Sequence, residues 1–131
     1  MQYPSEHPMS RAMYILGQIG AIICHERGPR PQTAVLNKMA SRPAEGFSIA
    51  IASMNALCPP RRGHRRALLQ WKHAEIRRLA DMLPDPLPTG ASAYSQMPFW
   101  AGYCQYWEYM LKQHVSPDIE FDAIQPEFAD A

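Results

Sequence analysis

Residues 97–111, "MPFWAGYCQYWEYML", place six aromatic side chains within about four helical turns. They are Phe99, Trp100, Tyr103, Tyr106, Trp107 and Tyr109. Neighbouring side chains on a helix point about 100° apart, so these rings cannot all face one way. Phe99, Tyr103, Tyr106 and Met110 recur at the spacing of one buried stripe. We therefore predict a helix whose aromatic stripe enters the core of a small domain.

Trp100 and Trp107 lie seven residues apart, on a different stripe of the same helix. Such rings can pack in the core, stack on nucleic-acid bases or anchor a protein interface. Partly exposed tryptophans are frequent interface anchors, and this helix lies in the acidic part of the chain. We expect Trp100 and Trp107 to contact other protein subunits, while stacking on bases stays the alternative.

The composition is that of one globular domain. The chain has 131 residues, 47% of them hydrophobic and 19% charged, which is enough to bury its own core. Thirteen prolines divide it into short segments and disfavour a long sheet. The longest apolar run is well short of the roughly twenty residues that a membrane span needs. Three widely spaced cysteines are typical of a reducing compartment, so we expect a cytoplasmic protein.

Helical periodicity and helix-start signals predict an all-α fold, a compact bundle of about five helices over residues 1–115. The expected helices cover about 11–26, 32–40, 42–57 and 64–83, and a last helix runs from Ser92 or Ser95 to about Gln113. Ser41 is the expected cap of the third helix, and Met82 is expected on the apolar side of the fourth. Residues 116–131 form an acidic tail that we expect to be extended or disordered.

Small residues occupy one strip of the first expected helix, which carries Gly17, Gly20, Ala21 and Cys24. Gly102 interrupts the aromatic helix, although a glycine inside a helix costs about 1 kcal/mol relative to alanine. The usual compensation is the close approach of another backbone. Both patterns predict tight helix contacts at these positions.

The charges are sorted along the chain, although its net charge is only +1. Residues 59–83 carry seven Lys or Arg against two acids, whereas residues 84–131 carry one against seven. On the helix expected over 64–83, the side chains of Arg66, His73 and Arg77 project within about 60° of one another, together with Arg62 just before it. We call this row the basic ridge.

A charged helix face is often merely solvated, and that interpretation stays open. Arginine, however, binds phosphate with two parallel hydrogen bonds, which favours phosphate contact. The predicted nucleic-acid-binding residues are Arg61, Arg62, Arg65, Arg66, Lys72, His73 and Arg77. Such contacts would be insensitive to sequence and sensitive to salt.

The sequence contains no recognisable catalytic or metal-binding motif. The histidines and cysteines show no C-x-x-C, H-x-x-x-H or H-E-x-x-H spacing, and the adjacent Cys24 and His25 point about 100° apart on a helix. The acids gather in the tail instead of forming pairs suited to acid–base catalysis. We therefore expect no enzyme activity, no metal site and no cofactor.

Three stretches resemble, in order, parts of a known family. They are "MYILGQIGAIICHE" (13–26), "ASRPAEGF" (40–47) and "QMPFWAGY" (96–103), the last with Gln96, Phe99, Gly102 and Tyr103 in a Q-x-x-F-x-x-G-Y pattern. Together they resemble the C-terminal helical part of the type I-C CRISPR large subunit. In that family the same part is also made as a separate short protein, the Cascade small subunit.

The resemblance implies a non-catalytic small subunit of a crRNA-guided type I complex. Such a subunit packs against copies of itself and against the backbone and large subunits. It also helps to hold the guide–target duplex or the displaced DNA strand by backbone contact. A protein-only helical adaptor or inhibitor, which binds or mimics a subunit of such a complex, is the alternative, and an enzyme of unrecognised type ranks third.

Overall fold

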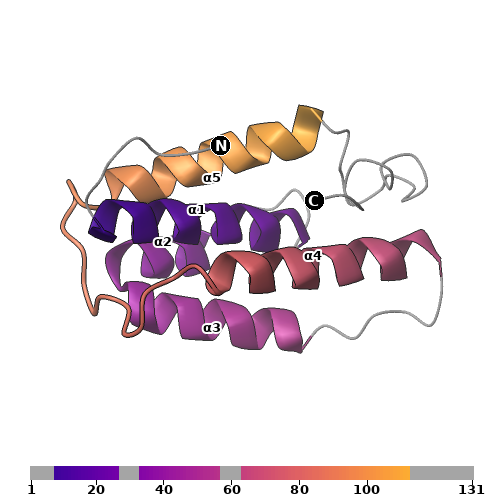
Figure 1. Ribbon diagram of the computed structural model, residues 1–131, viewed down its shortest axis with the longest axis horizontal. Coiled ribbons are helices and arrows are strands. Elements are labelled where there is room, and N and C mark those ends of the chain that lie inside the picture. Colours follow the sequence, from indigo (N-terminus) through magenta and orange to yellow (C-terminus); the bar gives the residue numbers. More distant parts are fainter. Residues whose placement is uncertain (1–7, 27–32, 57–62, 113–131) are drawn as a thin grey trace.

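Five helices make up the part of the chain that the structure describes, and no strand occurs in that part. The computed structural model describes residues 8–26, 33–56 and 63–112 (Figure 1). Its helices are α1 (Pro8–Glu26), α2 (Thr33–Ser41), α3 (Pro43–Asn55), α4 (His64–Ala80) and α5 (Met97–Lys112). The predicted all-α bundle is confirmed. The expected acidic tail lies outside the described residues.

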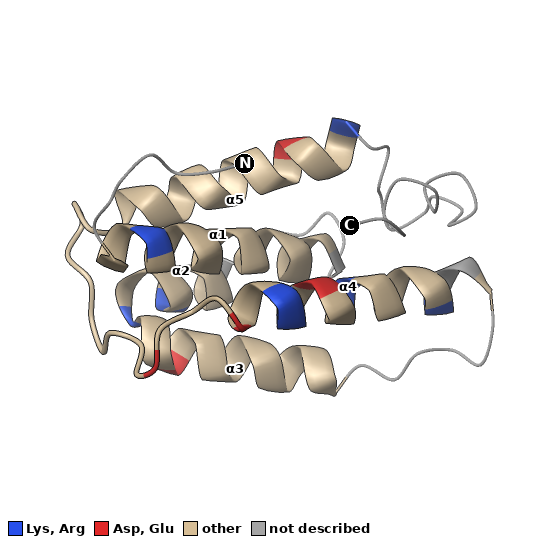
Figure 2. Ribbon diagram, viewed as in Figure 1, with Lys and Arg blue, Asp and Glu red and all other residues tan. Residues whose placement is uncertain are grey.

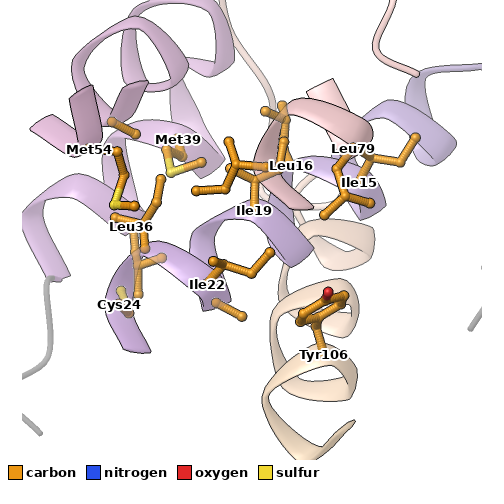
Figure 3. Packing of buried hydrophobic residues seen from close by; sticks show 14 of the residues in the cluster. Ile15, Leu16, Ile19, Ile22, Cys24, Leu36, Met39, Met54, Leu79 and Tyr106 are labelled. Carbon is orange, nitrogen blue, oxygen red and sulfur yellow. The ribbon is translucent and has the colours of Figure 1, made fainter. Parts of the chain in front are cut away.

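Helix α1 is the centre of the bundle. Every residue from Ala12 to His25 is buried, as expected of a helix that is apolar around most of its circumference. Its side chains separate two groups of core residues (Figure 3). Met39 and Met54 lie on the side of α2 and α3, while Leu79 and Tyr106 lie on the side of α4 and α5.

The tightest contact in the bundle joins α1 to α5. A Cβ atom on Gly17 would overlap the carbonyl oxygen of Phe99, and a Cβ atom on Gly102 would overlap the carbonyl oxygen of Tyr14. Each helix therefore contributes a glycine that lets the other backbone come close. This confirms the predicted tight contacts at both glycines, and it seats the fully buried ring of Phe99 in the core.

Helices α2 and α3 form a hairpin that the long connection between α4 and α5 holds in place. The amide of Ala44 donates to the carbonyl of Pro88 at 3.0 Å, and the amide of Ala91 donates to the carbonyl of Ser41 at 2.9 Å. These bonds tie the connection to the corner between α2 and α3. Because the connection also leads into α5, the hairpin and the α1–α5 pair are linked through it.

Some element boundaries differ from the predicted ones. Ser41 ends α2 and donates its hydroxyl to the carbonyl of Asn37 at 2.6 Å, so it does not cap α3, whose N-cap position is held by Arg42. Helix α4 ends at Ala80, which leaves Met82 outside it and 42% exposed. Helix α5 starts at Met97, later than either predicted serine.

Replacing Gly102 with alanine tests the contact between α1 and α5. Forcing a methyl group against the Tyr14 carbonyl costs about 3 kcal/mol, and the better helix propensity of alanine returns about 1 kcal/mol. We expect Gly102→Ala to lower the free energy of unfolding, measured by urea denaturation, by about 2 kcal/mol.

Gly90→Ala is the matched control. Gly90 is exposed, and a Cβ atom there would meet only the Ser41 carbonyl oxygen, at an ordinary 3.9 Å. Its free energy of unfolding should change by less than about 0.5 kcal/mol. Equal stability of the two variants would contradict the described contact.

Candidate nucleic-acid and protein interfaces

The structure describes only part of the basic ridge. Arg61 and Arg62 lie outside the described residues, and Arg65 belongs to α4 without a described side chain. Arg66 and His73 are half-buried, and Arg77 is exposed. Within the described part of the chain no carboxylate pairs with Arg77, although the neighbouring Arg78 pairs with Glu75. Of the ridge residues whose side chains the structure describes, Arg77 is the most exposed and is therefore the best placed to bind an external anion.

Lys72 does not belong to the ridge. Its side chain is fully buried, which contradicts its prediction as a nucleic-acid contact. At 100° per residue Lys72 projects about 20° from Leu79 and about 40° from Leu68 and Ile76, all of which are buried. Arg77 projects about 140° away from Lys72. The sequence analysis assigned Lys72 by its charge, whereas its angular position places it on the core face.

Two ridge residues, His73 and Arg77, lie in one wall of a groove between α3 and α4. This groove has a volume of about 550 Å³. Helix α3 lines it with Phe47 and Ile51, and α4 lines it with His73, Ile76 and Arg77. One wall is thus mainly apolar and the other carries positive charge. Phe47 and Ile51 have the spacing of one helix face, and both are only half-buried where they line this groove.

The groove continues into a second hollow of about 460 Å³, which shares Phe47, Ser48 and Ala80 with the first. Asp85 lines this second hollow, whereas no acid is among the described residues that line the first. The surface along the groove therefore changes from basic beside Arg77 to acidic beside Asp85. An anionic chain is expected to bind at the end with Arg77.

A row of aromatic rings runs along one side of α5. The ring of Trp100 meets that of Tyr103 edge-on at 6.0 Å, and Tyr103 stacks on Trp107 at 6.0 Å between centroids. Trp107 in turn contacts the ring of His25 edge-on at 5.5 Å. We call Trp100, Tyr103 and Trp107 the aromatic row. All three are partly exposed yet packed against the core.

The burial of the α5 side chains agrees only in part with the roles predicted for them. Phe99, Tyr106 and Met110 are buried, as predicted for the core stripe, but Tyr103 is only half-buried and lies between the tryptophans. Trp100 and Trp107 are partly buried and pack against the core of their own domain, so each leaves only part of its ring for another subunit. Exposed Met97 and Leu111 extend the apolar surface, and charge on α5 is confined to its last part (Figure 2). The interface role of Trp100 and Trp107 stays a prediction.

A buried polar cluster lies where α4 meets α5. The Tyr106 hydroxyl donates to Oε1 of Glu75 at 2.7 Å, and Nε of Arg78 donates to Oε2 of Glu75 at 3.2 Å. Burial, and then the negative charge of Glu75, raise the pKa of Tyr106 well above its usual 10.0. The cluster stabilises the contact between the helices, because a buried carboxylate needs such donors. The sequence analysis missed it, since pairs 31 residues apart leave no local signal.

The described residues offer no group of three or more His, Cys, Asp or Glu side chains that could hold a metal ion. Cys24 and His25 are both buried on α1, and His25 packs against Trp107. Among the helices that the structure describes, none has the length and apolarity needed to cross a membrane. The candidate sites that the described residues form are the α3–α4 groove and the aromatic row.

Tyr106→Phe tests the buried cluster through the pH dependence of stability. Because the pKa of Tyr106 is raised on folding, its contribution is fully present below the unfolded pKa of 10.0 and is lost as pH rises above it. Each pH unit in that range costs up to about 1.4 kcal/mol. The wild type should lose about 1 kcal/mol more than the variant between pH 9 and 11, by urea denaturation.

At neutral pH the same variant should be less stable by about 1–3 kcal/mol, because the buried Glu75 carboxylate loses a donor. Tyr94→Phe serves as the control, since Tyr94 is 83% exposed. If wild type and Tyr106→Phe lose stability equally at alkaline pH, the buried hydroxyl does not have the described role.

Comparison of the chain with family models, with curated proteins and with solved structures gives no match. The proposals below therefore depend on the geometry of these two surfaces and on the sequence patterns described first.

Proposed function

We propose that this protein is a non-catalytic small subunit of a cytoplasmic, crRNA-guided type I complex, and that it contacts nucleic-acid backbone through the α4 side of the groove. The observation that carries the proposal is the exposed Arg77 guanidinium beside His73, without a carboxylate partner in the described part of the chain. An arginine in this state can bind a phosphate without first breaking an ion pair.

The sequence resemblance adds a second line of support. Its most specific pattern includes Phe99 and Gly102, and these residues build the close contact between α5 and α1. The first resembling stretch supplies Gly17, the glycine on the other side of that contact. The shared positions are thus those that fix the helix pair, which is what a common helical scaffold requires. Function in this proposal comes from the surfaces that the scaffold displays.

The aromatic row is proposed to contact neighbouring subunits, either backbone or large subunits or further copies of this chain. Large, ordered aromatic rings are favoured interface anchors, because little side-chain entropy is lost when they bind. The rings of Tyr103 and Trp107 already stack on each other in the isolated chain. The same row favours the second candidate, a protein-only adaptor or inhibitor that binds such a subunit without touching nucleic acid.

Salt-dependent binding separates these two candidates. The affinity of the full chain for labelled single-stranded and duplex DNA would be measured by fluorescence anisotropy over a range of KCl concentrations. In Arg66→Gln/Arg77→Gln we expect weaker binding to every sequence, and a log–log salt slope smaller by roughly 1.4 for single strands or 1.8 for duplex.

Arg11→Gln is the matched control, because Arg11 is an exposed arginine at the start of α1, on another helix. It should retain the wild-type slope. A double variant with an unchanged slope would contradict a phosphate contact by the ridge. No measurable binding of the wild type at low salt would favour the protein-only adaptor.

A further inference from the structure

The groove between α3 and α4 leaves apolar side chains incompletely covered. Phe47 and Ile51 from α3 and Ile76 from α4 line it, and the first two are only half-buried. A volume of about 550 Å³ is large enough to receive several side chains of a peptide. An occupant that covers these residues would gain the free energy of burying apolar surface.

The charge of the groove restricts what can occupy it. Among the lining residues that the structure describes, only His73 and Arg77 are charged or titratable, and both lie on α4. A suitable peptide therefore presents apolar side chains on one side and carboxylates on the other. An extended chain achieves this with strictly alternating residues, because successive side chains point in opposite directions.

The sequence of this chain contains one such segment. Residues 118–122 read "DIEFD", in which three acids alternate with Ile119 and Phe121. From 113 to 131 there are five acids and no Lys or Arg, so nothing in that stretch repels Arg77 apart from a protonated His114. These residues lie outside the described part of the structure. Their composition complements both walls of the groove.

The linker from α5 to this segment is about as long as the longest described helix when it is extended. Phe121 follows the last residue of α5, Lys112, by nine positions. Nine residues span up to about 30 Å when extended, which is about the length of the 19-residue α1, the longest helix.

We propose that the α3–α4 groove binds the chain's own acidic segment, residues 118–122. Ile119 and Phe121 pack against Phe47 and Ile51, and the three acids face His73 and Arg77. The occupied groove withholds Arg77 from other anions. The docking itself does not depend on the proposed nucleic-acid function, but that function gives it a consequence. Under it, the acidic segment competes with nucleic-acid phosphates for the same guanidinium.

Photo-cross-linking tests the docking in the full chain without nucleic acid. Phe121 is replaced by p-benzoylphenylalanine, the protein is irradiated at low concentration, and the cross-linked peptides are identified by mass spectrometry. We expect intramolecular cross-links to residues of α3 and α4 that line the groove. Cross-links to other surfaces, or between two copies, would overturn the proposal.

Charge reversal in the same cross-linking protein provides the second arm. Arg77→Glu replaces an attraction by a repulsion and should lower the yield about tenfold, equivalent to about 1.4 kcal/mol. Arg11→Glu, an equal change on another helix, should leave the yield unchanged. An equal fall in both variants, or no fall in either, would contradict specific docking beside Arg77.

Neutralising the segment connects the docking to the proposed function. The variant Asp118→Asn/Glu120→Gln/Asp122→Asn should bind DNA more tightly than the wild type, whereas Glu127→Gln/Asp130→Asn, outside the alternating segment, should change affinity less. Groove cross-links with no DNA binding by any variant would refute the proposed function and leave the docking intact. DNA binding without groove cross-links would do the reverse.

Discussion

The backbone contact between α1 and α5 is the constraint on which the rest of the structure depends. Gly17 and Gly102 let the two helices approach until a Cβ atom at either position would overlap a carbonyl oxygen of the other helix. At this separation Phe99 is fully buried beside α1, and Tyr106 on the next turns of α5 reaches Glu75 of α4. The same rotation of α5 turns Trp100 and Trp107 outward along its side. One close contact therefore fixes the core, the buried polar cluster and the aromatic row.

The candidate nucleic-acid site arises where packing is least complete. Helix α4 packs against α1, buries Lys72 on the same side as its apolar residues, and contacts Tyr106 of α5 through Glu75. His73 and Arg77 lie on another side of α4 and line the groove that α4 shares with α3. Because α3 and α4 are separated by this groove, Phe47 and Ile51 stay partly exposed, and the free energy that their full burial would contribute is not gained. A surface that combines half-buried apolar side chains with a guanidinium that has no carboxylate partner among the described residues is suited to an anionic chain, whether nucleic acid or an acidic peptide.

The sequence predicted what local spacing determines and missed what depends on contacts between distant helices. Five helices, the buried stripe of Phe99, Tyr106 and Met110, and the tight contacts at Gly17 and Gly102 all follow from periodicity and residue size. Lys72 was assigned to the surface by its charge, although its angular position between Leu68 and Ile76 marks the core face. The groove could not be foreseen, because Phe47 and Ile51 have the helical spacing of core residues and only the position of α4 leaves them partly uncovered. The pairing of Tyr106 with Glu75 likewise requires the packed bundle.

Native-state hydrogen exchange of the full chain tests the central role of the α1–α5 contact most directly. If that contact holds the bundle together, the mid-helix amides of α1 and α5 exchange only through global unfolding, and they share the highest protection of the molecule. Amides of α3, which faces the open groove, should exchange through smaller openings at lower free energy. Faster exchange in the middle of α1 or α5 than in α3 would contradict the account, because the glycine contact could then open while the rest of the fold persisted.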